Sequence, residues 1–292
     1  MVAAAIVLGL ALAFCFGTSD YLSKGLVGKV GSYRATVYTL ATSGALVAVP
    51  SLFLGEARRT TYADGAILGV IACSTFAAFA FMYRGYQRGN LSVVSPVVNS
   101  FPIFSVGFSV LVLGVRISGG VLLALTGVIL GVLLVSTDMS VLGSARRTLT
   151  PGVPEALAAS VLFAVALTSL GDGYSRMGYL LPPISARAGG ALVGLLAGAA
   201  SGQDLRPFRG PPLVRLLAMA ALEAAGLFAF GLASFYSSGL AALPITTTLA
   251  GMGAVFTVGF ALLLLKERVM LNHAVGIAVI VTSVAALLYL TA

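Results

Sequence analysis

The chain has 292 residues, of which 59% are hydrophobic and 9% charged, and its formal net charge is +8. A soluble domain carries about 25% charged residues, so a chain this poor in charge cannot cover a water-facing surface of its own size. The composition excludes a soluble globular protein and predicts an all-α integral membrane protein whose outer surface faces lipid.

The net positive charge does not indicate a nucleic-acid partner. The 17 Lys and Arg residues are scattered singly or in pairs between apolar runs, which is typical of charges that flank membrane spans. Cys15 and Cys73 lie inside apolar runs and are expected to be small buried residues rather than a disulfide or metal pair. We therefore expect the bilayer and a small-molecule substrate as partners, no cofactor, and either a monomer or a homodimer.

Apolar runs of the length that crosses a bilayer recur along the whole chain. The first lacks a preceding basic segment and a cleavage site, so we expect a retained helix rather than a signal peptide. The ten expected spans are residues 3–23, 33–54, 64–86, 91–114, 119–137, 153–176, 182–201, 213–237, 241–265 and 271–291. Longer polar connections follow the fifth and seventh spans.

The chain also shows signs of an internal repeat. A shift of 152 residues places Phe104, Gly107 and Phe108 on Phe256, Gly259 and Phe260, and a shift of 153 places Arg34 on Arg187. These matches predict a first repeat at residues 1–140, a loop at 141–152 and a second repeat at 153–292. Because five spans is an odd number, the two repeats must insert with opposite orientation, as in many secondary transporters.

Several segments resemble the EamA-type branch of the drug/metabolite transporter superfamily. The segment Phe16-Gly17-Thr18-Ser19 with Lys24 downstream is similar to the opening of that family, and residues 83–96 are similar to its third-to-fourth helix junction. The segment Leu265-Lys266-Glu267-Arg268 is similar to the end of its ninth helix, although Lys266 replaces the usual Gly. The resemblance implies ten helices and the export, or sometimes uptake, of small metabolites such as amino acids.

Glu223 is the sharpest candidate for a functional side chain, because it lies in the middle of the apolar eighth span. Polar residues inside spans are costly and usually face the bundle interior or a cavity. Glu223 is expected either to couple transport to a proton or cation, or to lock two helices together as a protonated or Arg-paired acid. Asp20 and Asp172 occupy matching places in the two halves, and each is a coupling candidate or a local helix cap.

Other polar residues inside the spans are candidates for substrate binding. Arg34, Tyr38 and Thr42 recur every four residues along the second span, and Arg187 is the matching charge on the seventh. An Arg beside a cavity is suited to hold a carboxylate, although snorkelling to the headgroups is the alternative. The remaining candidates come from the third, fourth, eighth and ninth spans: Tyr83, Ser95, Asn99, Tyr236, Thr246 and Thr247. For these, interfacial anchoring and ordinary helix–helix hydrogen bonds are the competing roles.

The sequence thus predicts a secondary transporter, not an enzyme, that moves a small polar or zwitterionic, amino-acid-like metabolite by alternating access in export or exchange. A carrier of cationic or multiple drugs is the alternative within transport. A membrane-embedded lipid-modifying enzyme is the alternative from another class, but its metal cluster or nucleophile motif is not found in the sequence. We expect a multi-pass protein of a prokaryotic cytoplasmic membrane. The orientation of the termini is open, because the loop charges favour termini outside and the family resemblance favours termini inside.

Overall fold

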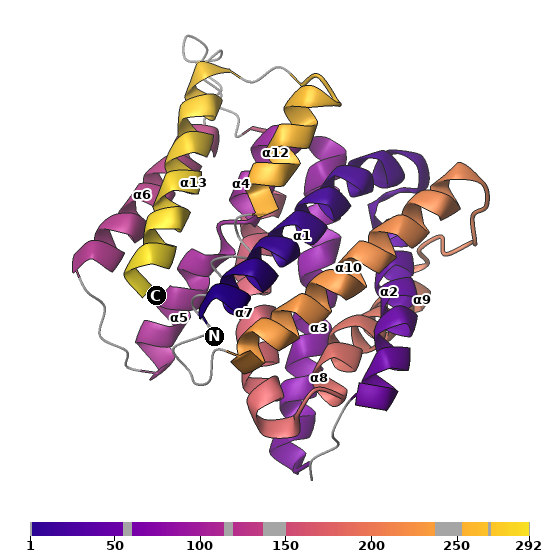
Figure 1. Ribbon diagram of the computed structural model, residues 1–292. Coiled ribbons are helices and arrows are strands. Elements are labelled where there is room, and N and C mark those ends of the chain that lie inside the picture. Colours follow the sequence, from indigo (N-terminus) through magenta and orange to yellow (C-terminus); the bar gives the residue numbers. More distant parts are fainter. Residues whose placement is uncertain are drawn as a thin grey trace.

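The computed structural model describes residues 2–54, 60–113, 119–136, 150–236, 253–267 and 270–291, and these residues form a bundle of helices without a strand (Figure 1). The helices of the first half are α1 (Val2–Val30), α2 (Ser32–Leu54), α3 (Tyr62–Arg88), α4 (Leu91–Val98), α5 (Phe101–Leu113) and α6 (Gly119–Ser136). Those of the second half are α7 (Val153–Met177), α8 (Leu181–Ile184), the π-helix η2 (Ser185–Gly189), α9 (Gly190–Ser201), α10 (Pro211–Tyr236), α12 (Gly253–Leu263) and α13 (Leu271–Thr291).

These helices lie within the expected spans, the ninth of which is described only from Gly253, and two of the described spans are not continuous α-helices. The fourth span breaks at Asn99 and Ser100, between α4 and α5, close to Pro102, which has no N–H to continue the helix. The seventh span contains the π-helix η2 between α8 and α9. Both irregular segments contain a residue that lines the central cavity, as π-turns and broken membrane helices often do.

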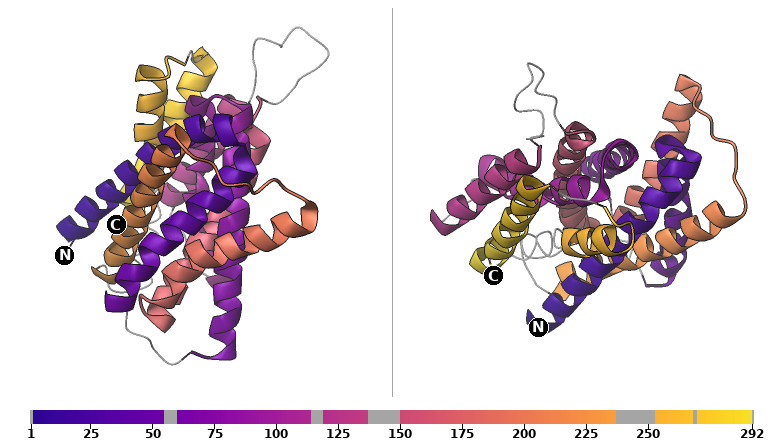
Figure 2. Two further views of the ribbon diagram at one scale, coloured as in Figure 1. Left: turned by 90° about the vertical axis from the view of Figure 1, so that its right-hand side faces the viewer. Right: turned by 90° about the horizontal axis from the view of Figure 1, so that it is seen from above.

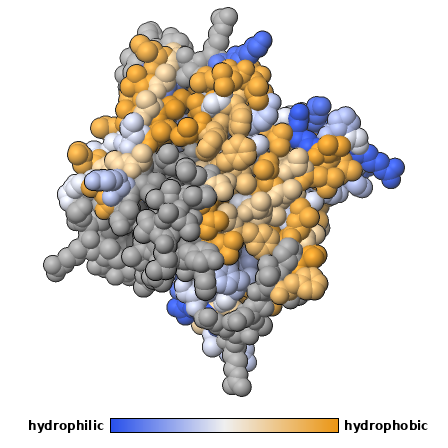
Figure 3. Space-filling view, in the orientation of Figure 1, coloured by the Kyte–Doolittle hydropathy of each residue, from blue (hydrophilic) through white to orange (hydrophobic). Residues whose placement is uncertain are grey.

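The surface of the bundle is suited to lipid. Four described helices are long and apolar enough to cross a bilayer, at Tyr62–Arg88, Val153–Met177, Leu181–Ser201 and Pro211–Leu232, and shorter apolar helices accompany them. Large apolar side chains such as Phe53, Leu123, Leu263 and Leu271 are exposed on several helices. Figure 3 shows apolar side chains over most of the coloured part of one face, with hydrophilic side chains mainly at its edges. The protein is an integral multi-pass membrane protein.

The helices pack in pairs that join the two halves of the chain. The most extensive contacts are those of α1 with α10, α3 with α7, and α6 with α13. The α6–α13 pair lies at the periphery, where both helices make smaller contacts with α4 (Figures 1 and 2). The two ends of the chain lie close to each other in both figures.

The short connection between α3 and α4 is held by two charged side chains from elsewhere in the chain. Lys24 of α1 donates hydrogen bonds from Nζ to the carbonyls of Tyr86 (2.6 Å) and Gly89 (2.5 Å), at the C-terminal end of α3. Glu267, after α12, accepts hydrogen bonds from the N–H groups of Leu91 (3.0 Å) and Ser92 (2.8 Å) at the start of α4. These charges satisfy helix-end groups that would otherwise lack a partner.

Candidate functional site

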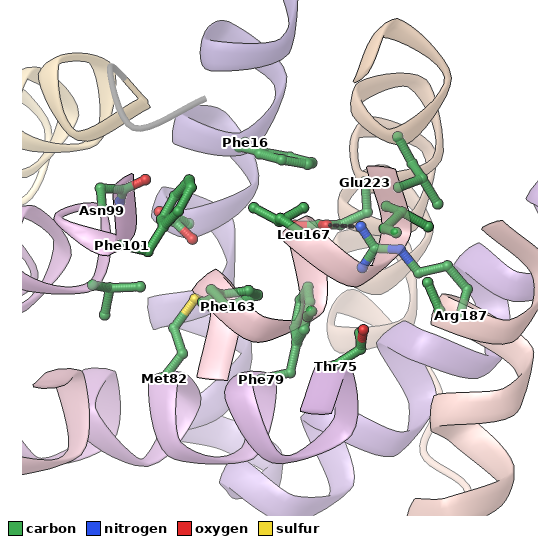
Figure 4. Close-up of a pocket in the computed structure, with 16 residues that line it drawn as sticks. Phe16, Thr75, Phe79, Met82, Asn99, Phe101, Phe163, Leu167, Arg187 and Glu223 are labelled. Carbon is green, nitrogen blue, oxygen red and sulfur yellow. Dashed lines mark hydrogen bonds and ion pairs between the residues drawn. The ribbon is translucent and has the colours of Figure 1, made fainter. Parts of the chain in front are cut away.

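A cavity lies inside the bundle, between helices of both halves of the chain. Its wall is mostly apolar and aromatic. Figure 4 shows Asn99 and Phe101 on one side and Arg187 reaching in from the opposite side. The side chains that line it are Phe16, Asp20, Thr75, Phe79, Met82, Val98, Asn99, Phe101, Phe163, Ala166, Leu167, Leu170, Ala186, Arg187, Glu223 and Leu227.

The cavity wall contains a buried ion pair between Arg187 of η2 and Glu223 of α10. Arg187 Nη2 lies 2.8 Å from Glu223 Oε2, and each side chain is only 4% exposed. Ser19 of α1 donates a hydrogen bond of 2.7 Å to the other carboxylate oxygen, Oε1. Glu223 therefore matches the Arg-paired alternative considered from the sequence, and it connects α1, η2 and α10.

The guanidinium of Arg187 is only partly satisfied by the protein. Its Nε and Nη1 atoms are buried and have no hydrogen-bond partner, while its carbon lies 4.9 Å from the centroid of the Phe79 ring. A cation over an aromatic face is stabilised by the ring quadrupole, which does not replace the missing acceptors. Because buried polar groups are nearly always hydrogen-bonded, these two nitrogen atoms are available to donate to a ligand with acceptor atoms.

Asp20 also faces the cavity, without joining the ion pair. It is 6% exposed, and its Oδ2 atom accepts a long hydrogen bond of 3.4 Å from the Thr257 hydroxyl of α12. Asn99, at the break between α4 and α5, and Tyr86 of α3 also lie beside its carboxyl group. Asp20 thus lies where four elements of the bundle meet.

Two of the expected polar positions on the second span face a loop instead of the cavity. Arg34 lies 3.4 Å from Asp204 Oδ2, donates a hydrogen bond to the carbonyl of Arg206, and packs against Phe208. Tyr38 donates a hydrogen bond of 2.9 Å to the carbonyl of Leu205. These contacts fix the connection between α9 and α10 to α2, and they leave Arg187 as the arginine of the matched pair that faces the cavity. Thr42, further along α2, is half-buried and does not line the cavity.

The remaining candidates divide among the cavity, the layer behind it and the surface. Asn99 lines the cavity, and its Nδ2 atom donates to Ser95 Oγ (3.1 Å), so Ser95 lies one step behind the wall. Tyr83 is fully buried and packs edge-on against Phe79, also behind the wall.

Asp172 is 43% exposed and pairs with Arg176 at 2.8 Å, away from the cavity. Thr246 and Thr247, and the side chain of Tyr236, lie outside the described residues.

Sequence reasoning missed most of the aromatic wall. Phe16, Phe79, Phe101 and Phe163 come from four different helices, and a Phe in a membrane span does not differ in pattern from one that faces lipid. Ser19, the partner of Glu223, could have been identified from the sequence, because it lies in the segment Phe16–Ser19 that carries the family resemblance.

Comparison with known proteins agrees with this architecture. Residues 3–137 match the model of the EamA-like transporter family. A solved structure described only as "Crystal structure of protein" superposes with a TM-score of 0.68 over 97% of this chain and 96% of that one, at 15% sequence identity. At this identity the likeness concerns the fold alone. The search of curated proteins gives no match.

Proposed function

Since its residues 3–137 place this chain in the EamA-like transporter family, part of the drug/metabolite transporter superfamily, we propose that it moves a small zwitterionic, amino-acid-like metabolite by alternating access. Transport is by export or exchange, in the cytoplasmic membrane of a prokaryote. The observation that carries this proposal is the buried Arg187–Glu223 pair, whose arginine faces the cavity with two donors unused.

An internal ion pair is suited to exchange with a zwitterion. In the empty cavity, Glu223 and Arg187 neutralise each other. When the substrate enters, its carboxylate accepts hydrogen bonds from Arg187, through the free Nη1 and through the Nη2 that Glu223 releases. The substrate ammonium then pairs with the freed carboxylate of Glu223. Arg187 and Glu223 each keep a charged partner at every stage, so this pair is electrostatically balanced in both the empty and the loaded carrier.

The same pair argues against a carrier of simple cations. A monovalent cation that bound Glu223 would leave Arg187 as an uncompensated buried charge, which costs on the order of 3–5 kcal/mol when a buried pair is broken. The aromatic wall, with Phe16, Phe101 and Phe163, favours an apolar side chain on the substrate. Zwitterions with an aromatic or aliphatic side chain fit both features.

The packing of the two halves supports an inverted repeat. If α1 corresponds to α7 and α3 to α10, exchanging the halves turns the α1–α10 contact into the α7–α3 contact, and both are among the most extensive in the molecule. The α6–α13 contact maps onto itself under the same exchange. Two packings related in this way are what alternating access requires of the two halves. We expect residues 3–137 to superpose on 153–291 about an axis in the membrane plane.

The proposal is tested with purified protein in liposomes loaded with unlabelled L-leucine or L-phenylalanine. We expect saturable counterflow of the labelled amino acid, and no inhibition by isoamylamine or phenethylamine, which lack the carboxylate. Arg187→Lys is expected to weaken inhibition by amino acids, because an ammonium cannot reproduce the planar fork of a guanidinium.

Arg34→Lys is the matched control, because Arg34 holds the 202–210 loop rather than the cavity. Its apparent affinity for amino acids is expected to equal that of the parent. Counterflow by the amines with the amino acids inactive would favour the cationic-compound carrier and contradict the zwitterion proposal. Phospholipid turnover without transport would favour an enzyme.

A further inference from the structure

Asp20 is a second buried acid in the cavity, and its charge is not balanced. No described Lys, Arg or His side chain forms an ion pair with Asp20, whereas Glu223 is paired with Arg187. With its carboxylate ionised, the cavity therefore carries one negative charge more than positive charge. A buried charge without a partner is costly, and it calls for a cation or a proton.

The charged groups nearest to Asp20 are engaged elsewhere. Lys24 lies one turn further along α1, and its Nζ atom donates to the carbonyls of Tyr86 and Gly89. Glu223 of α10 is the other acid that faces Asp20, and it is bonded to Ser19 and Arg187. The other groups around Asp20 are the neutral side chains of Tyr86, Asn99 and Thr257, from α3, the α4–α5 break and α12.

The neighbours of Asp20 are able to serve both forms of the carboxyl group. The Tyr86 hydroxyl has no exposed surface and lies within hydrogen-bonding reach of the Asp20 carboxyl group, although it makes no bond of regular geometry to a described residue. The hydroxyls of Tyr86 and Thr257 can donate to a carboxylate and can equally accept from a carboxylic acid. Buried hydroxyls are nearly always hydrogen-bonded, so the irregular contact between Tyr86 and Asp20 points to a bond that becomes regular in one protonation state.

Asp20 also lies at a place where its protonation can change the contacts between helices. Asn99, beside it, occupies the interruption between α4 and α5. The Thr257 hydroxyl of α12 connects this helix to α1, because it contacts both Asp20 Oδ2 and the Gly17 carbonyl (3.3 Å). Interrupted helices at a cavity are typical positions for coupling-ion sites. A change of charge at Asp20 therefore alters bonds among four elements of the bundle.

We propose that Asp20 is the proton-binding group that couples net transport to the proton gradient, with Glu223 reserved for the substrate. A proton enters Asp20 from the water at one face and leaves to the water at the other, and no other atom is exchanged. A single carboxyl among hydroxyl and amide groups suits a proton better than a divalent ion, which takes six or more oxygen ligands in the case of calcium. This proposal rests on the proposed transport function, and it can be tested apart from it.

The first measurement needs no substrate. Infrared difference spectra of the purified protein are recorded as the pH is changed above about 5, where exposed carboxyl groups are already ionised, and the carboxylic C=O band is followed. We expect a titrating band that is lost in Asp20→Asn and retained in Glu223→Gln and in the control Asp172→Asn, whose acid lies at the surface beside Arg176. Asp20→Glu should restore a titrating band if Asp20→Asn lowers the yield of folded protein. A band that persists in Asp20→Asn, or that follows sodium at fixed pH, would overturn the proposal.

The second measurement uses the liposomes with L-leucine or L-phenylalanine as the probe. Accumulation driven by a pH gradient is expected in the parent and in Asp172→Asn, and its loss is expected in Asp20→Asn. If gradient-driven accumulation persists in Asp20→Asn, the proposed proton site is wrong, even though the amino acids are transported. If neither amino acid is transported while the infrared band behaves as expected, the proton site stands and the proposed substrate class fails.

Discussion

At the scale of single residues, the protein is governed by the charges it buries. Arg187 and Glu223 are almost inaccessible, so their attraction is screened little by solvent, but each has also lost its hydration. Buried pairs of this kind contribute little net stability, and removing one partner is far more damaging than removing both. We therefore propose that this pair serves substrate binding more than it serves stability.

This reasoning predicts the result of a double-mutant cycle on the pair. Glu223→Gln leaves the Arg187 charge unbalanced and should lower the stability of the folded protein by on the order of 3–5 kcal/mol. The double variant Arg187→Met with Glu223→Leu should be more stable than either single variant, although inactive in counterflow. Thermal unfolding in detergent measures both effects. Equal losses in the single and double variants would contradict the picture of a desolvated pair.

At the scale of elements, close contacts between helices explain two features of the family-like segments. A Cβ atom on Gly17 would lie 2.6 Å from the Gly253 carbonyl and 2.7 Å from Phe256 Cβ, so only glycine lets α1 approach α12 this closely. After α12, Lys266 adopts a positive φ of 52°, the conformation that glycine takes without strain, which explains why Gly is usual at this place in the family. The strained turn places Glu267 on the N-terminus of α4.

The glycine contact gives a prediction with a control in the same helix. Gly17→Ala meets backbone atoms that cannot rotate away, and it should lower stability by about 1–3 kcal/mol, as overpacking does. Gly28→Ala, where a Cβ meets nothing within 4 Å, should be neutral or raise stability by up to about 1 kcal/mol. Thermal unfolding of the two variants in one detergent compares them directly. Equal melting temperatures would show that the α1–α12 contact is looser than described.

At the scale of the whole molecule, basic residues gather at the end of the bundle away from the two termini. Lys24 and Lys29 lie near the end of α1, Arg34 near the start of α2, and Arg206 and Arg209 in the connection before α10. Figure 1 shows this end opposite the N and C labels, and Figure 3 shows hydrophilic side chains there. Positive residues are retained on the cytoplasmic side during insertion.

The charge distribution therefore predicts termini outside the cytoplasm. A C-terminal alkaline phosphatase fusion is expected to be active, because this enzyme folds outside the cytoplasm. A C-terminal green fluorescent protein fusion is expected to be non-fluorescent, because that protein folds inside the cytoplasm. A fluorescent C-terminal fusion with an inactive phosphatase fusion would reverse this assignment, and it would agree with the orientation that the family resemblance implies.

The sequence alone determined the class of protein and the places of its apolar helices, because hydropathy along the chain is a local property. The family resemblance is confirmed by the family model that matches residues 3–137. It also singled out Asp20, Arg187, Glu223 and Asn99, because a polar residue in an apolar span is visible without a structure, and these four line the cavity. It could not separate Arg187 from Arg34, because the two arginines occupy matching places in the repeats and differ only in what packs against them.

Only the tertiary structure decided how these residues act. The pairing of Arg187 with Glu223 joins residues 36 positions apart, and the bond of Ser19 to Glu223 joins residues 204 positions apart. Neither contact leaves a periodic signal in the sequence, since each depends on how η2, α1 and α10 are placed around the cavity. The same placement leaves Asp20 without a basic partner, because the balance of buried charge is a property of the packed bundle and not of any single helix.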